Sequence, residues 1–159
     1  DLSHMKPAQR EDINFDHPNS IDFELFARHI GVLTGGSAVD CPLYDFSTHC
    51  RLSKTETVLP AEILLVEGIL VASSDLLMSL YDYLIFIEAS SSLRRRRRMG
   101  RDKRERGREK GSIDRFWERA ENTFTDFGAR AREDAQLIVC GEQPSKHVVT
   151  EVIKYIGLK

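Results

Sequence analysis

This sequence of 159 residues lacks long apolar runs and paired cysteines. No stretch approaches the roughly 18–20 consecutive apolar residues that a membrane-spanning helix needs, and no basic segment followed by an apolar one opens the chain, so we expect neither a membrane anchor nor a secretory signal. The three cysteines, Cys41, Cys50 and Cys140, are an odd number and show no Cys-x-x-Cys spacing. Because structural zinc sites and disulfide frameworks use closely paired cysteines, the sequence favours reduced thiols in a cytoplasmic protein.

The composition is that of an ordinary globular protein. Hydrophobic residues make up 41% and charged residues 30% of the chain, whose length suits one compact domain at residues 1–159. The net charge of −2 is unevenly spread, since eleven Arg or Lys stand against three acids between Arg94 and Lys110. Such a local positive concentration favours a specific anion site over general nucleic-acid coating.

Short apolar runs alternate with helical patterns along the chain. The helical patterns cover 23–33 (with Asp22 as its cap and Gly35-Gly36 at its end), 76–80, the arginine-rich stretch after Ser90–Ser92, 113–131 (with Ser112 as its cap) and 148–156. The strand patterns are 38–46 and 55–59, joined as an antiparallel hairpin through a polar loop, and the continuously apolar 62–66, 84–87 and 137–139. This alternation predicts an α/β fold with a mostly parallel sheet flanked by helices.

The segment Asn14–Pro18 is a candidate for binding a sugar. Asp16, held rigidly by the proline that follows His17, could accept hydrogen bonds from sugar hydroxyls. The simpler interpretation is an Asx-type turn before a helix, with the histidine exposed, and both interpretations remain open.

The predicted hairpin carries a possible pocket for a nucleic-acid base. Tyr44 and Phe46 project to the same side of a strand and offer an aromatic wall, while His49 could form hydrogen bonds to the edge of a pyrimidine. An ordinary strand with its aromatic residues in the core and a solvated histidine is the alternative.

Two further groups of charged residues point to phosphate chemistry. Glu67 follows the apolar run 62–66, and strand-end carboxylates commonly hold Mg²⁺ in phosphoryl-transfer enzymes; a contact with a helix N-terminus has comparable weight. Within Arg94–Arg108, the spacing puts several guanidinium groups along one helix face, where they could clamp phosphates, although charge runs are usually solvated faces. If this arginine-rich segment closes over the phosphates as a lid, Gly107 would let it bend.

Taken together and in this order, these residues resemble the uridine kinase family of P-loop nucleoside kinases. The resemblance covers nearly the whole chain, and its matching strings are Asn14–Pro18 with Asp22, Pro42–His49 with Arg51, Glu56-Thr57-Val58, Glu67-Gly68-Ile69-Leu70, and Arg101-Asp102 through Glu105-Arg106-Gly107-Arg108. It implies a P-loop kinase-like fold with a β-hairpin nucleoside-binding insert. It also implies transfer of the γ-phosphate of ATP, with Mg²⁺, to the 5′-hydroxyl of uridine or cytidine in pyrimidine salvage, and a possible homotetramer.

By position, the resemblance assigns the nucleoside pocket to the first half of the chain. Asp16 corresponds to the residue that accepts the ribose hydroxyl, and Tyr44, Phe46 and His49 correspond to the base pocket.

The phosphate-side residues are assigned in the same way. Arg98 and Arg108 correspond to further nucleoside contacts, Arg101 and Arg106 to catalytic lid arginines near the phosphates, and Glu67 to the carboxylate that helps to hold Mg²⁺.

The sequence also departs from the family pattern. It contains no Gly-x-x-x-x-Gly-Lys-Ser/Thr, and the general-base aspartate, the first strand and the first helix are not matched, so we expect a truncated chain that is inactive alone, with apolar surface exposed where the first strand would lie. A glutamine that the family uses near the nucleoside is replaced around Arg115–Phe116. The Pro-Arg-Gly after the last strand is replaced by Cys140-Gly141-Glu142.

Other functions stay open at this point. One is a non-catalytic nucleoside-binding module. Another is a protein that binds RNA or another polyanion through the arginine-rich helix, which is disfavoured because the aromatic interleaving of RNA-binding modules is missing. Among enzymes, a phosphoribulokinase-like relative comes second, since Tyr44–His49 fits a base pocket better.

Overall fold

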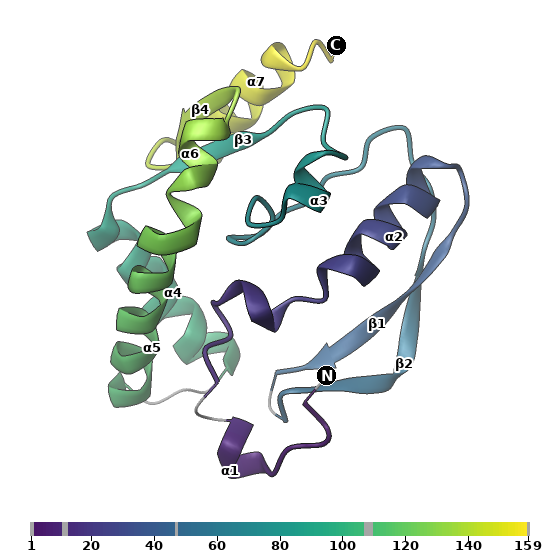
Figure 1. Ribbon diagram of the computed structural model, residues 1–159. Helices are drawn as coiled ribbons and strands as arrows, with labels where there is room; N and C mark the ends of the chain where they lie inside the picture. The colour runs from purple at the N-terminus through teal and green to yellow at the C-terminus, as the bar shows by residue number, and fades with distance from the viewer. Residues whose placement is uncertain (1, 11–12, 47, 107–109, 159) are drawn as a thin grey trace. The chain divides into compact units, whose positions relative to one another are not determined.

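The computed structural model describes residues 2–10, 13–46, 48–106 and 110–158, with only the backbone at 7–8, 105–106 and 110–116. Contacts within the chain separate two compact units, a first unit Asp1–Leu80 and a second unit Tyr81–Lys159 (Figure 1). This division does not test the prediction of one domain at residues 1–159.

The helix α2 (Phe23–Thr34) is the main helix of the first unit, which also contains the short helices α1 (Pro7–Arg10), η1 (Pro18–Ser20) and α3 (Asp75–Met78). Asp22 caps α2 as predicted, because its Oδ1 accepts a hydrogen bond of 3.0 Å from the Leu25 N–H. The helix ends at Gly35, and Gly36 follows with φ +83°, a conformation that glycine adopts without a steric penalty. Its buried face consists of Ala27, Ile30 and Leu33.

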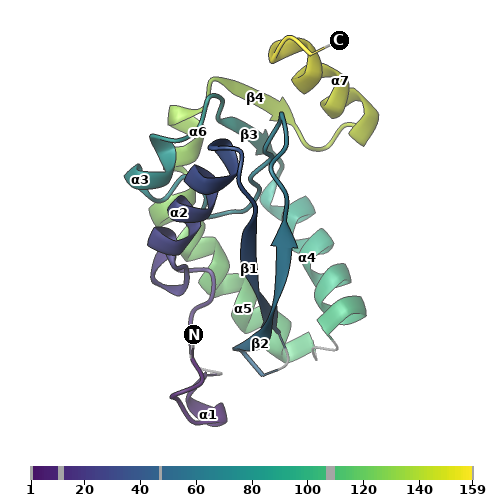
Figure 2. The ribbon, with the colours of Figure 1, turned by 90° about the vertical axis from the view of Figure 1, so that its right-hand side faces the viewer.

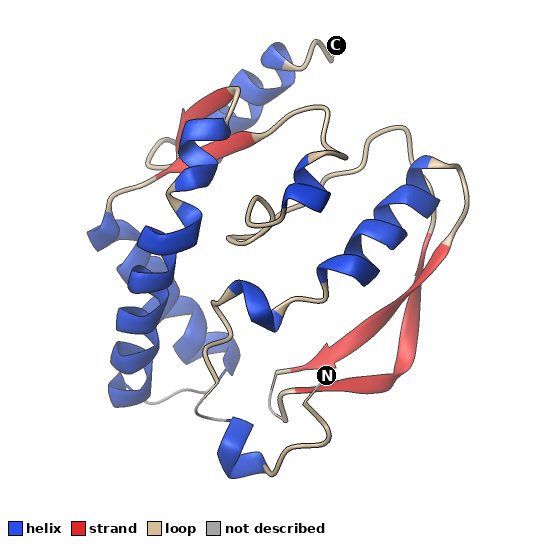
Figure 3. Cartoon of the chain, in the orientation of Figure 1, coloured by secondary structure: helices blue, strands red, loops and turns tan. Residues whose placement is uncertain are grey.

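The strands β1 (Val39–Asp45) and β2 (Cys50–Val58) form the predicted antiparallel hairpin (Figure 3). Their register pairs Val39 with Val58 and Asp45 with Cys50. The prediction that the second strand begins at Thr55 was wrong, since β2 begins five residues earlier. Most of β2 is exposed, so its polar residues lie in the strand without losing contact with water.

The prediction of a buried strand at 62–66 was also wrong. This stretch has no regular secondary structure, and the exposed fractions are 53% for Ile63 and 85% for Leu65. A strand needs a neighbour to accept and donate its backbone hydrogen bonds, and no described strand lies beside this segment. Apolar side chains are therefore exposed in this segment, and the expectation of apolar surface where the first strand would lie stays a prediction.

In the second unit, β3 (Ile85–Glu88) and β4 (Leu137–Cys140) pair in parallel, with Ile85 opposite Leu137 and Glu88 opposite Cys140. The unit thus shows the predicted α/β pattern of helices and parallel strands. Because β3 has β4 as its single described neighbour, it is less buried than predicted, and the exposed fraction of Ile87 is 60%.

Helices follow and surround these two strands. The arginine-rich α4 (Ser91–Arg106) comes directly after β3, as predicted, and α5 (Lys110–Thr123) continues through the π-helical turn η2 (Phe124–Gly128) into α6 (Arg130–Asp134). Ser112 lies inside α5, so the prediction that it caps this helix was wrong. The closing helix α7 (Ser145–Tyr155) packs beside β4 (Figure 2). None of the helices in the described ranges is long and apolar enough to cross a bilayer.

The end of β4 makes a close backbone contact with β3. The Gly141 N–H donates a hydrogen bond of 2.7 Å to the Glu88 carbonyl oxygen, which extends the parallel ladder by one bond beyond β4. A Cβ atom at this position would lie 2.7 Å from Ile87 Cγ2 and 3.1 Å from the Glu88 oxygen. Only glycine leaves room for this contact.

Replacing Gly141 by alanine is therefore expected to lower the free energy of unfolding by about 1–3 kcal/mol, the usual cost of overpacking. Gly100→Ala in α4 is the matched control, because a Cβ atom there meets nothing within 4 Å and alanine favours a helix interior by roughly 0.5–1 kcal/mol. Urea unfolding followed by circular dichroism measures both. A Gly141→Ala variant as stable as the wild type would contradict the packing argument.

Candidate nucleoside site and arginine helix

The tip of the hairpin has a well-defined local structure. Thr48 Oγ1 donates a hydrogen bond of 2.8 Å to Asp45 Oδ2, and His49 adopts a left-handed backbone conformation with φ +56°. The imidazole ring of His49 stacks on Phe15, with 4.3 Å between ring centroids and 16° between ring planes. The hairpin tip and the Asn14–Pro18 segment therefore meet at an aromatic stack.

Tyr44 and Phe46, the predicted aromatic wall, contact each other edge to face with their ring centroids 5.2 Å apart. The exposed fraction is 36% for Tyr44 and 60% for Phe46, so aromatic surface remains open to a ligand. Burial raises the pKa of the Tyr44 hydroxyl, and the nearby Cys50 and Asp45 raise it further. The phenol accordingly stays protonated and can donate a hydrogen bond at neutral pH.

The Asn14–Pro18 segment folds as a hydrogen-bonded turn. Asn14 Oδ1 accepts a hydrogen bond of 3.1 Å from the Asp16 N–H, and His17 Nδ1 accepts one of 3.1 Å from the Asn19 N–H. Asp16, which directly follows the stacking partner of His49 in the sequence, therefore lies in a fixed turn. Phe15 has no role predicted from the sequence, although its position between the polar residues Asn14 and Asp16 could have marked it.

An ion pair ties β2 to the start of α2. Arg51 Nη2 lies 3.0 Å from Asp22 Oδ2, while the other carboxylate oxygen caps the helix. The hydrogen bond from the Leu25 N–H, followed by that from Arg51, lowers the pKa of Asp22 below its ordinary value. Asp22 and Arg51 belong to two different family strings, and the structure shows that these residues are in direct contact within the first unit.

Glu67, the predicted metal ligand, is exposed and lies outside any strand. The described ranges contain no group of three or more His, Cys, Asp or Glu side chains that could hold a metal ion. Mg²⁺ prefers several oxygen ligands in a near-octahedral arrangement. Because phosphoryl-transfer enzymes commonly hold Mg²⁺ with one or two carboxylates, phosphate oxygens and water, this finding does not test Glu67, whose role stays a prediction.

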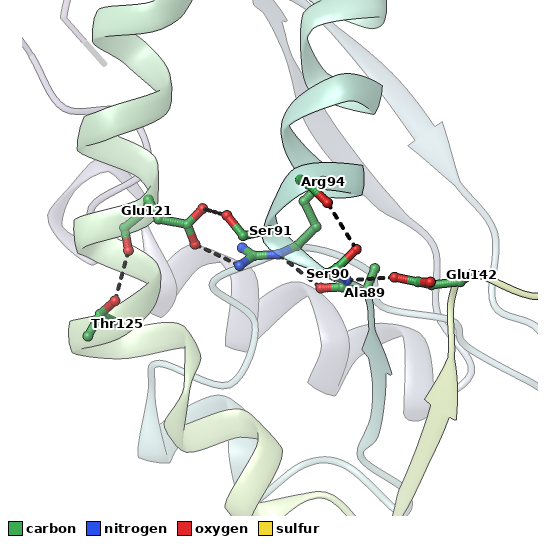
Figure 4. A network of polar contacts seen from close by, with 8 residues as sticks. Ala89, Ser90, Ser91, Arg94, Glu121, Thr125 and Glu142 are labelled. Atoms are coloured by element: carbon green, nitrogen blue, oxygen red, sulfur yellow. Dashed lines mark hydrogen bonds and ion pairs between the residues drawn. The ribbon is translucent and has the colours of Figure 1, made fainter.

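Arg94 is held inside the second unit (Figure 4). Its Nη2 lies 2.6 Å from Glu121 Oε1 on α5, its Nε donates a hydrogen bond of 3.2 Å to the Ala89 carbonyl, and its guanidinium lies 4.4 Å from the centroid of the Phe124 ring. Ser91 Oγ donates a hydrogen bond to the second Glu121 oxygen. This arginine joins the start of α4 to α5, so it serves packing and not anion binding.

Arg98, predicted to contact the nucleoside, and Arg101, predicted to be a catalytic lid arginine, share a buried carboxylate. Asp102 is completely buried and lies 3.7 Å from Arg98 Nε and 3.3 Å from Arg101 Nη2. Of the two arginine side chains, that of Arg98 is the more buried, with 14% of its surface exposed against 45% for Arg101. The structure brings both arginines to one aspartate, which the sequence motif contains but which received no role.

The two remaining arginine predictions concern the end of the helix. The side chain of Arg106 and the whole of Arg108 lie outside the described residues.

The Cys140-Gly141-Glu142 segment, which departs from the family pattern, meets the start of α4. Glu142 Oε1 accepts a hydrogen bond of 2.9 Å from the Ser90 N–H (Figure 4), and contacts with Ser90 lower the pKa of this carboxyl. A carboxylate at a helix N-terminus also complements the helix dipole.

The family model described as phosphoribulokinase / uridine kinase family matches residues 1–147. The chain is 42% identical to a uridine kinase from Clostridium tetani over 113 residues, which are 71% of this chain and 54% of that protein.

Two further relatives cover more of the chain. A uridine kinase from Shewanella amazonensis is 32% identical over 155 residues, or 97% of this chain and 73% of that protein. One from Haemophilus influenzae is 34% identical over 140 residues, or 87% of this chain and 66% of that protein. The chain spans about half the length of the first curated relatives that it matches.

Replacing Asp22 by alanine is expected to lower the free energy of unfolding at neutral pH by about 1 kcal/mol, the usual value of a helix cap; the exposed pair with Arg51 adds little. Because folding lowers the pKa of Asp22, its contribution is complete above the ordinary value of 3.8 and is lost as the pH falls through the folded-state value. Unfolding of wild type and variant, measured at pH 7 and at steps below pH 4, should therefore show a shrinking difference. Glu24→Ala, an exposed acid in the same first turn, is the control, and a difference independent of pH would contradict the assignment.

Arg94→Ala is expected to destabilise the second unit by about 1–3 kcal/mol, since it removes a half-buried ion pair and a cation–π contact and leaves Glu121 without this cation. The matched control is Arg96→Ala, at an exposed position of the same helix, which should change stability by no more than about 0.5 kcal/mol. Thermal unfolding of both variants and of the wild type measures these stability changes. Equal effects would show that Arg94 belongs to the solvated arginines.

Proposed function

Because this chain belongs to the phosphoribulokinase / uridine kinase family, we propose that it is the acceptor-binding part of an ATP-dependent kinase acting on uridine or cytidine. Transfer of the γ-phosphate to the 5′-hydroxyl would rely mainly on positioning and electrostatics. Residues 1–159 would be one partial kinase domain of a cytoplasmic protein, and this protein would assemble as a homotetramer.

The observation that carries the proposal is the aromatic cluster at the hairpin tip. Two ring pairs, Phe15 with His49 and Tyr44 with Phe46, lie in the first unit on or beside the same tip. A pyrimidine base offers flat faces to aromatic rings and polar edges to an imidazole or a phenol. Tyr44, Phe46 and His49 would hold the base in this way, and Asp16 would accept the ribose hydroxyl.

On the phosphate side, the proposal assigns anion binding to the arginines of α4 that do not serve packing. Arg101 would approach the phosphates, together with Arg106, while Arg98 and Arg108 would contact the nucleoside. Asp102 would orient Arg98 and Arg101 and partly offset their charge. Guanidinium N–H groups are suited to phosphate and hydroxyl oxygens, which are the acceptors that such a substrate offers.

The donor side is not provided by these residues. The sequence contains no Gly-x-x-x-x-Gly-Lys-Ser/Thr, whose backbone N–H groups, lysine and hydroxyl would bind the phosphates and Mg²⁺. Mg²⁺ bound by the intact kinase would neutralise phosphate charge, with Glu67 as one candidate contact. We therefore expect this chain alone to bind nucleoside without catalysing transfer.

A second candidate function is a non-catalytic nucleoside-binding module. It would use the same aromatic cluster, but the similarity to uridine kinases does not favour it. Polyanion binding through α4 has less support, because Arg94 is used for packing against α5 and Arg98 and Arg101 are paired with Asp102.

The proposal predicts that the chain binds uridine or cytidine without ATP, and that His49→Ala raises the dissociation constant about tenfold, the value of one hydrogen bond to a base. Isothermal titration calorimetry measures this, with His147→Ala on the exposed start of α7 as the matched histidine control. An ATP-dependent uridine phosphorylation assay completes the test. No binding by the wild type would refute the nucleoside site, and robust turnover would refute the assignment of this chain to the acceptor part alone.

A further inference from the structure

The guanidinium group of Arg10, the last residue of α1, forms hydrogen bonds to three backbone carbonyls. Nε and Nη2 donate to the Met5 oxygen at 3.0 and 2.7 Å, Nη2 also lies 3.3 Å from the Ser3 oxygen, and Nη1 donates to the Thr48 oxygen at 2.9 Å. Two of these carbonyls belong to the segment before α1 and the third to the hairpin tip. A single side chain thus connects segments that are 38 residues apart.

The Thr48 carbonyl belongs to the peptide group that leads into His49. A fixed oxygen fixes the plane of that peptide and therefore the direction from which His49 continues. The φ of +56° at His49 is unfavourable for a residue with a Cβ atom, and such a conformation persists only where its surroundings enforce it. The Arg10 bond, the Thr48–Asp45 bond and the stack on Phe15 are contacts that support this conformation.

The charge of Arg10 also reaches the other aromatic pair. Burial is the main cause that raises the pKa of Tyr44, and the positive charge of Arg10 opposes this rise. The guanidinium therefore lies near the hairpin residues on which the proposed base pocket depends.

We propose that Arg10 is the positioning residue of the base pocket, which holds the Thr48–His49 peptide so that the imidazole stacks on Phe15. It acts through His49 and does not touch the ligand. Lysine could not replace it, because a single ammonium group cannot reach the separate carbonyls that the planar guanidinium fork spans. The effect on nucleoside affinity rests on the proposed function, whereas the effect on the position of His49 does not.

The test compares Arg10→Ala and Arg10→Lys with the wild type and with Arg28→Ala, an exposed arginine on α2 that serves as the matched control. The first measurement is the NMR chemical shift of the His49 ring protons, which the stacked Phe15 ring displaces upfield. Both Arg10 variants should move this shift toward that of an unstacked histidine, while Arg28→Ala should not. The second is calorimetry with uridine, in which both Arg10 variants should raise the dissociation constant about tenfold, or 1.4 kcal/mol.

The outcomes separate this inference from the proposed function. An unchanged His49 ring shift in both Arg10 variants would overturn the inference even if the wild type binds uridine. A wild type that binds no uridine would refute the proposed function, and the ring shift would still decide the role of Arg10. If Arg10→Lys has the wild-type ring shift and the wild-type affinity for uridine, the inference is also overturned, because a single charged group would then suffice. If Arg10→Ala fails to fold, Arg10→Lys gives the decision by the same shift.

Discussion

Backbone groups removed from water must find hydrogen-bond partners, and this requirement shapes both units. Each described strand has one partner: β1 pairs with β2, and β3 pairs with β4. Where a partner exists, the ladder is regular, and Gly141 adds one further bond beyond the end of β4. Where none exists, even the apolar segment 62–66 forms no strand. The same requirement explains the hairpin tip, at which an arginine side chain satisfies the Thr48 carbonyl.

Local signals in the sequence predicted local structure well. Asp22 could be identified as a helix cap and Gly35-Gly36 as a helix end because both act through their immediate neighbours. The strand at 62–66 could not be judged in this way, since its formation depends on a neighbouring strand and not on its own apolar side chains. Polarity also misplaced the start of β2, because an exposed strand tolerates polar residues. Local patterns therefore indicate which secondary structure a segment can adopt, while the presence of a partner strand decides whether a strand forms.

The same distinction between local patterns and long-range contacts applies to the candidate site. The residue types of the aromatic cluster could be chosen from the sequence, but the Phe15–His49 stack joins segments that are distant along the chain. Composition alone does not distinguish the arginines of α4 by their contacts, whereas the structure separates Arg94, which packs through Glu121, from Arg98 and Arg101, which pair with Asp102. Arg10 gave no signal at all, because its contacts are with backbone carbonyls, which every residue has.

The exposed segment Ile63–Val66 has a consequence for the behaviour of the chain in solution. Four apolar residues in a row, without proline or charge, are shorter than the six or seven residues typical of amyloid segments, but their unpaired backbone groups could still pair with another chain. Pro60 and Glu62 stand before it and Glu67 follows it, so residues that oppose intermolecular strand pairing flank both sides. Glu67 can thus protect solubility independently of any metal, a role that its place in a kinase motif would conceal.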